Sequence, residues 1–182
     1  MTYQEKEIML KDGSPCILRS AKVTDAEDLI RYLKITAAET PYLVREPEEV
    51  DLTMEEEESY LRMKESADRE LLLVAIAEGR HVGNCTLMSQ GSYKRYAHRC
   101  CIAIALYQEY CKRGIGKAML ETVLETARGC GYEQAELEVA AENKPALHLY
   151  QSLGFKICGT FPRNMKYRDG TYSDTYFMVK NL

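Results

Sequence analysis

The stretch that decides the fold is YCKRGIGKA, residues 110–118. An apolar, β-rich run at 100–106 precedes it, and a segment with helical periodicity follows it. The apolar residues of that segment are Ile115, Met119, Leu120, Val123, Leu124 and Ala127. Gly129 and Gly131 then interrupt the pattern, as glycines commonly do at a helix end. The sequence therefore predicts a strand, a glycine loop and an amphipathic helix in succession.

A glycine loop at the start of a helix suits a pyrophosphate. The first amides of a helix lack intrahelical acceptors and carry a partial positive charge, and glycine lets a phosphate approach the backbone closely. Lys112, Arg113 and Lys117 add formal positive charge. Glycines also make ordinary turns, so the loop alone leaves ligand binding and a plain turn open. It matches neither the Walker pattern nor the dinucleotide-binding pattern, which also requires alternating parallel strands.

A second motif makes the pattern specific. Residues 143–155 read NKPALHLYQSLGF, which resembles the Asn-x-x-Ala-x-x-Leu-Tyr-x-x-x-Gly-Phe element of the GNAT superfamily of N-acetyltransferases. The loop resembles the Arg/Gln-x-x-Gly-x-Gly/Ala pattern of the same superfamily, with Gly114 and Gly116 matching and Cys111 in the first position. The resemblance extends over residues 16–179, and the specific motifs lie within residues 98–155.

This resemblance implies an α/β (α+β) fold, with a mixed, mostly antiparallel central sheet whose central strands splay apart and are flanked by helices. It implies one N-acetyltransferase domain over residues 1–182. The expected reaction transfers the acetyl group of acetyl-CoA to a primary amine of a small molecule or a peptide, by direct attack. A CoA-binding sensor or regulatory domain without turnover is the alternative.

The resemblance also implies which residues bind acetyl-CoA. The backbone of Ile104, Ala105 and Leu106 is expected to pair with the pantetheine arm, while their side chains pack in the core. Asn143 is either a plain helix N-cap or a cap that also bonds the cofactor. The remaining expected cofactor-binding residues are Cys111, Lys112, Arg113, Gly114, Ile115, Gly116, Lys117, Ala146 and Tyr150.

Three residues are candidates for catalysis. Tyr150 matches the superfamily tyrosine near the CoA sulfur, and a phenol protonated at neutral pH suits the protonation of a leaving thiolate. Its helical spacing with Ala146 is equally compatible with packing alone. A base must also deprotonate the amine, and Glu138 and His98 are the candidates for it. An exposed strand glutamate and a structural histidine are the alternatives for these two residues.

Cys111 invites a separate hypothesis. It lies beside Lys112 and Arg113 at a predicted helix start, where a thiol is expected to lose its proton more readily than usual. The sequence therefore suggests an oxidation-sensitive thiol that bound CoA shields.

The other predicted elements surround the two motifs. Helices are expected after the possible capping boxes Thr24–Glu27 and Thr53–Glu56, and a short one starts at Asn143. Strands are expected at residues 16–19, 71–77, 81–88, 100–106, 135–140, 155–161 and 171–179. Tight turns are expected at residues 78–80 and 168–170, each joining two neighbouring strands into a hairpin.

Composition narrows the class of protein. The net charge is −4, which offers no basic footprint for nucleic acid. There is no apolar run long enough to span a membrane and no secretory signal pattern, so we expect a cytoplasmic protein without membrane contact. The seven cysteines form no Cys-x-x-Cys pair, so reduced thiols without a metal site are expected. The amine acceptor is not specified by the sequence, and a homodimer is an expectation at the level of the superfamily.

Overall fold

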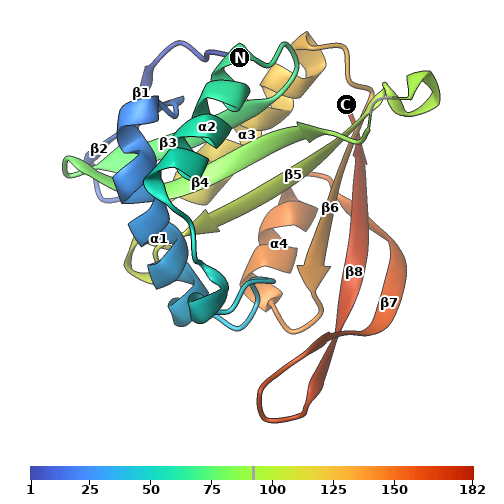
Figure 1. Cartoon of the computed structure of the whole chain (residues 1–182). Helices are drawn as coiled ribbons and strands as arrows, with labels where there is room; N and C mark the ends of the chain where they lie inside the picture. Colours follow the sequence, from blue (N-terminus) through green and yellow to red (C-terminus); the bar gives the residue numbers. More distant parts are fainter. Residues whose placement is uncertain (92) are drawn as a thin grey trace.

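The computed structural model describes residues 1–91 and 93–182. Its strands form one eight-stranded sheet in the order β1-β2-β3-β4-β5-β6-β8-β7 (Figure 1). The strands are β1 (Lys6–Met9), β2 (Pro15–Ser20), β3 (Leu71–Ala77), β4 (Arg80–Ser89), β5 (Arg99–Leu106), β6 (Gln134–Ala140), β7 (Lys156–Lys166) and β8 (Tyr172–Asn181).

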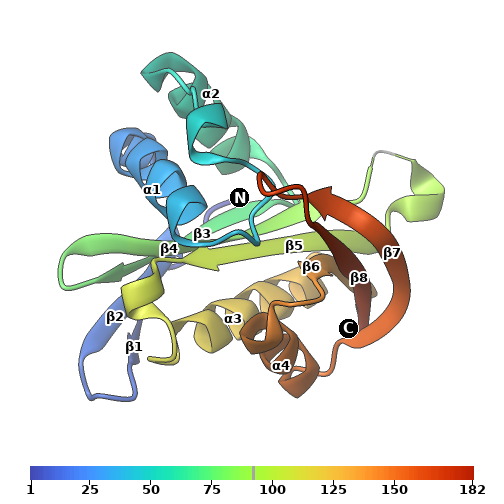
Figure 2. The same cartoon turned by 90° about the horizontal axis from the view of Figure 1, so that it is seen from below.

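Helices cover both faces of the sheet. Figure 2 shows α1 (Ala26–Glu39) and α2 (Met54–Ser66) on one face, and α3 (Ile115–Gly129) and α4 (Lys144–Ser152) on the other. Short 3-10 turns are η1 (Val23–Asp25), η2 (Pro47–Glu49), η3 (Lys94–Tyr96) and η4 (Gln108–Tyr110). Among the described residues, no helix is both long and apolar enough to cross a membrane.

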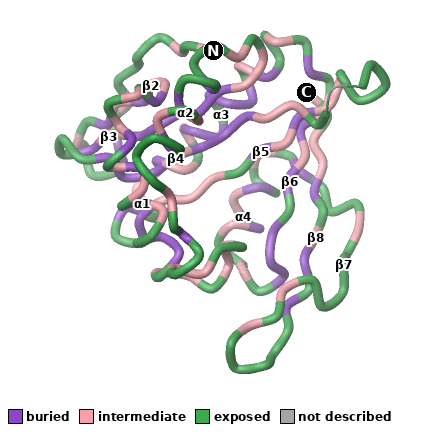
Figure 3. The backbone as a smooth tube through the Cα atoms, viewed as in Figure 1, coloured by how far each residue is buried: buried purple, intermediate pink, exposed green. Residues whose placement is uncertain are grey.

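The largest core lies between the sheet and α3. The predicted apolar stripe of α3 is buried along its whole length, from Ile115 to Ala127. It packs against β3, whose run Leu71–Ala77 is buried at every position except the half-buried Ile76. Figure 3 shows this buried centre and the contrasting exposure of β7 at the sheet edge. The helical and strand periodicities that predicted these elements therefore also located the core.

The face covered by α1 and α2 has a smaller core. Leu29 of α1 and Leu61 of α2 pack with Leu72 and Val74 of β3. The Thr53 capping box is confirmed, because its hydroxyl accepts from the Glu56 amide and the Glu56 carboxylate accepts from the Thr53 amide.

The predicted capping box at Thr24 is wrong. The chain first makes the 3-10 turn η1, and α1 begins at Ala26. There the Asp25 carboxylate accepts from the Lys22 amide at 2.8 Å and pairs with Arg19 at 2.7 Å. The carboxylate that organises this helix start is therefore Asp25 rather than Glu27.

The sheet is mixed and mostly antiparallel, as predicted. Within residues 1–91 and 93–182, the single parallel pair is β5 with β6, and its register joins Arg99–Cys101 to Gln134–Glu136 only. Beyond Cys101 the two strands diverge, which confirms the expected splay. The sequence missed β1, a four-residue strand at the sheet edge with largely exposed side chains, and it ended β7 too early.

Candidate functional site

The glycine loop turns sharply between β5 and α3. After η4, Lys112 has a φ of 64° and Gly114 a φ of 101°, so the backbone visits the left-handed region twice. Glycine adopts that region without the steric cost of a Cβ, which accounts for Gly114 at the N-cap of α3. The conformation turns the backbone of the loop toward the first turn of the helix.

Amides of this loop lack acceptors among the described residues. Among the described residues, the N–H groups of residues 112–117 donate no hydrogen bond to the chain, and the first helical bond runs from the Ala118 amide to the Gly114 carbonyl at 3.1 Å. The Cys111 amide is already used, because it donates to the Gln108 carbonyl at 3.1 Å. Consecutive unpaired amides at a helix N-terminus form an anion-binding concavity. The residues therefore fit a diphosphate, and the first amide of the loop without an acceptor among the described residues is that of Lys112.

The three basic side chains near the loop are not equivalent. The Arg113 guanidinium donates to Asp12 at 2.9 Å and to Glu78 at 3.1 Å, so its charge is already balanced within the protein. Lys117 lies 3.8 Å from Glu121 one turn along α3. Lys112 is exposed and forms no ion pair among the described residues. The expected contribution of Arg113 to the positive charge of the loop is therefore cancelled by its two carboxylate partners.

An unpaired strand edge leads to the loop. β5 pairs with β4 along its length, through to Leu106 opposite Gly83, but it has no pairing to β6 after Cys101. The backbone of Ile104, Ala105 and Leu106 therefore offers a free edge on the side of the splay. An extended chain that carries amide groups can pair with such an edge in the manner of an added strand.

Asn143 and Ala146 lie at the start of α4. The Asn143 side chain accepts from the Ala146 amide at 3.3 Å, which confirms its role as N-cap. The next turn carries Leu149, whose Cδ2 lies 3.5 Å from the position that a Cβ on Gly116 would occupy. The first turn of α3 and the second turn of α4 therefore meet beside the splay.

Tyr150 is buried beneath this junction. Its side chain is 7% exposed and packs edge-on against Phe155, with ring centroids 6.0 Å apart. Burial raises the pKa of Tyr150 well above its usual value, so the phenol is protonated at neutral pH. The hydroxyl makes no hydrogen bond to another described residue. The packing and acid roles considered for this tyrosine are compatible, because the ring packs while the hydroxyl has its donor available.

The two candidate bases lie in very different places. Glu138 is exposed on β6 just past the splay, where the Asn164 amide donates to its carboxylate. His98 precedes β5 at the end opposite the loop, and its carbonyl accepts from the Glu133 amide at 2.8 Å. An eight-residue strand spans about 25 Å, so His98 is too far from the loop end of β5 for direct proton transfer there.

Residues that sequence reasoning missed line the same face as Glu138. Ala103 is exposed in the middle of β5, although β5 lies between two other strands. Side chains alternate along a strand, so Ala103 points away from α3, toward which Ile104 points. Asn164 of β7 also donates to the Thr175 hydroxyl at 2.8 Å. An exposed small residue in a central strand indicates open space, and only the tertiary arrangement reveals it.

The expected lowering of the Cys111 pKa is not found. The residue as a whole is exposed, but its thiol packs against the Tyr107 carbonyl, with the sulfur 3.6 Å from the oxygen. Burial of that thiol raises its pKa, and the nearby Glu39 adds to the rise, while Lys112 opposes it. Desolvation therefore outweighs the positive charges that suggested a reactive thiolate.

Comparison with known sequences identifies relatives. The model of the acetyltransferase (GNAT) family matches residues 33–155. The L-amino acid N-acetyltransferase AaaT of Escherichia coli is 30% identical over 109 residues, 59% of this chain and 66% of the relative. The L-amino acid N-acyltransferase MnaT of the same organism is 25% identical over 111 residues, 61% of this chain and 64% of the relative. The matches thus span about two thirds of each relative.

Solved structures share the fold. A GNAT-family acetyltransferase from Streptococcus pneumoniae superposes with a TM-score of 0.88 at 30% identity, covering 92% of this chain and 99% of its own. The Salmonella typhimurium protein yncA, solved with its cofactor acetyl-CoA, gives a TM-score of 0.80 at 17% identity over 91% of this chain and 92% of its own. The family model matches most of the chain. The splayed strands and the unpaired loop amides are consistent with that match. The chain belongs to the GNAT family of acetyltransferases, whose cosubstrate is acetyl-CoA.

Proposed function

We propose that this protein transfers the acetyl group of acetyl-CoA to a primary amine of a small molecule or a peptide, by direct attack. The observation that carries the proposal is the continuous set of free backbone groups around the splay. Unpaired amides at residues 112–117 suit the diphosphate, and the open edge of β5 from Ile104 to Leu106 suits the pantetheine arm. Bound acetyl-CoA supplies the thioester carbonyl and the thiol leaving group.

Different residues of the chain carry out the separate steps of the transfer. Tyr150 holds the proton that the leaving thiolate requires, because its phenol is protonated at neutral pH and its hydroxyl donates to no other described residue. The β5 backbone near Leu106 orients the thioester and polarises its carbonyl. Glu138 removes the ammonium proton from the incoming amine, directly or through water, while Asn164 fixes its carboxylate.

The acceptor approaches over the face that carries Ala103 and Glu138. That face lacks a covering helix next to the splay (Figure 2), and Ala103 leaves room above β5. The loop between α1 and α2 borders this face. Arg168 in the β7–β8 turn forms ion pairs with Glu46 and Glu48 of that loop. Two relatives are named for L-amino acids, so free L-amino acids are the first acceptors to test.

The deciding experiment measures cofactor binding and turnover separately. Calorimetry with CoA tests whether the loop binds the cofactor, and thiol release from acetyl-CoA tests turnover against amino acids, polyamines and peptides. We expect saturable CoA binding and acceptor-dependent thiol release. CoA binding without release for any acceptor would instead support a sensor without turnover, and no CoA binding would refute both functions.

We also propose that residues 1–182 act as one domain in the cytoplasm.

A further inference from the structure

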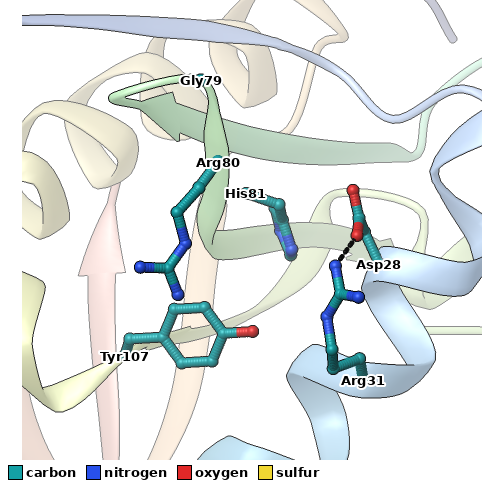
Figure 4. A pocket seen from close by; sticks show the side chains of 6 residues that line it. All are labelled: Asp28, Arg31, Gly79, Arg80, His81 and Tyr107. Atoms are coloured by element: carbon teal, nitrogen blue, oxygen red, sulfur yellow. Dashed lines mark hydrogen bonds and ion pairs between the residues drawn. The ribbon is translucent and has the colours of Figure 1, made fainter.

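A small cavity lies on the face of the sheet covered by α1. Its volume is about 200 Å³, and it opens between the N-terminal half of α1, the β3–β4 turn and the residue that follows β5 (Figure 4). The lining residues are Asp28, Arg31, Gly79, Arg80, His81 and Tyr107. None of them belongs to the proposed cofactor or acceptor site.

The floor of this cavity is a histidine without hydrogen-bond partners. His81 is 8% exposed, and neither Nδ1 nor Nε2 has a partner in hydrogen-bonding geometry among the described residues. Burial lowers its pKa to about 4, although the Gly83 backbone and the Asp25 and Asp28 carboxylates favour the protonated ring. The neutral ring has one donor and one acceptor. A buried polar atom left unsatisfied costs about 1–3 kcal/mol, so this ring favours a polar ligand.

Aromatic packing fixes the position of the histidine. The Tyr32 ring meets His81 edge-on at a centroid distance of 4.6 Å and Tyr107 at 5.2 Å. Figure 4 shows His81 between Arg80 and Tyr107 on one side and the Asp28–Arg31 pair on the other, with the Tyr107 hydroxyl directed toward the space between them. A ligand would therefore meet donors already held in place.

The charges of the lining favour a monoanion. It carries the guanidinium groups of Arg31 and Arg80 and the Asp28 carboxylate, so one positive charge is in excess. Arg31 is hydrogen-bonded to Asp28, which leaves Arg80 as the available cation. The nearest carboxylate to Arg80 is that of Glu109 at 3.6 Å, and both of those side chains are about 60% exposed. A planar carboxylate matches a guanidinium fork and balances a single charge.

We propose that this cavity binds a small monocarboxylate, whose oxygens accept from the Arg80 guanidinium and the Tyr107 hydroxyl beside the buried His81 ring. The bound carboxylate joins α1, β4 and Tyr107. Tyr107 directly follows Leu106, and its amide donates to the Val82 carbonyl at 3.0 Å. The site thus contacts the strand end next to the proposed pantetheine edge without being part of it.

An NMR titration of the full chain tests the site. Acetate, phosphate and chloride are added separately at constant ionic strength and pH 7, and the amides of Gly79 and Tyr107 are followed. We expect acetate alone to give saturable shifts, and the same shifts with saturating CoA. Arg80→Gln is expected to weaken acetate binding about tenfold. Tyr107→Phe, which keeps the ring against Tyr32, is expected to weaken it severalfold.

A matched control separates the cavity from general surface charge. Arg62 of α2 is also 60% exposed and paired to a glutamate, and α2 contributes no residue to the cavity lining, so Arg62→Gln should leave acetate binding unchanged. The proposal is overturned if chloride or phosphate shifts these amides as strongly as acetate, if Arg62→Gln weakens binding as much as Arg80→Gln, or if CoA abolishes the shifts. If Arg80→Gln does not fold, unchanged acetate binding by Tyr107→Phe overturns it equally.

Discussion

Leu106 and Gly116 approach so closely that a Cβ on Gly116 would lie 3.2 Å from the Leu106 Cδ1 atom. The contact sets the distance between the first turn of α3 and the open end of β5. These are the two elements whose free backbone groups make up the proposed cofactor site. The size of residue 116 therefore controls the geometry of that site.

We expect Gly116→Ala to push α3 away from Leu106 and to weaken CoA binding severalfold. The added methyl group also overpacks the contact with Leu106, which costs about 1 kcal/mol of unfolding free energy. Urea denaturation and calorimetry with CoA measure the two effects. Gly129→Ala is the control, because a Cβ there meets nothing within 4 Å. Equal CoA affinities for both variants would contradict the proposed geometry.

Tyr150→Phe is expected to lower kcat by about 10²-fold or more, the usual contribution of a general acid. The KM for acetyl-CoA should change little, because the ring still packs against Phe155. Steady-state thiol-release assays give both constants. A variant with unchanged kcat would restrict Tyr150 to a packing role.

Stability is expected to fall as the pH is lowered from 6.5 toward 4. The pKa of His81 is lowered from 6.5 to about 4 in the folded protein, so the unfolded chain binds more protons in this window. Above pH 6.5 the ionisation of His81 does not change the unfolding free energy with pH, and below pH 4 it causes no further loss. Between pH 7 and pH 5 the loss should be about 2 kcal/mol, measured by urea denaturation. His81→Phe, which retains an aromatic ring beside Tyr32, should remove most of this dependence.

Substitutions of Lys112 and Arg113 should have different effects, one on CoA binding and the other on stability. Lys112→Gln removes an exposed cation beside the free amides, so it should weaken CoA binding more at low salt than at high salt. Arg113→Gln breaks the contacts to Asp12 and Glu78 and should lower the thermal unfolding midpoint instead. Calorimetry at two salt concentrations and thermal denaturation distinguish the variants. The reverse pattern would show that the guanidinium reaches the phosphates.

Features that depend on residues close together in the sequence could be predicted from it. The stripe of α3, the Asn143 cap and the run of β3 follow from spacing within a few residues. The ion pairs of Arg113 had no local signal because its carboxylate partners lie 101 and 35 positions away. The pKa of Cys111 could not be predicted from neighbouring charges because burial depends on packing. The cavity around His81 also had no local signal, since three separate elements bring its lining together.

The pairing of β5 with β6 over Arg99–Cys101 has a mechanical consequence. The sheet consists of two halves joined by this short seam, the pairing of Arg99–Cys101 with Gln134–Glu136. The Arg99 guanidinium on β5 donates two hydrogen bonds to the Glu136 carboxylate on β6 across the seam. A small rotation about the seam displaces Leu106, at the far tip of β5, much more than it displaces Cys101. The Arg99–Glu136 contact therefore holds the two halves of the sheet together at the end of β5 opposite the opening that would receive the thioester.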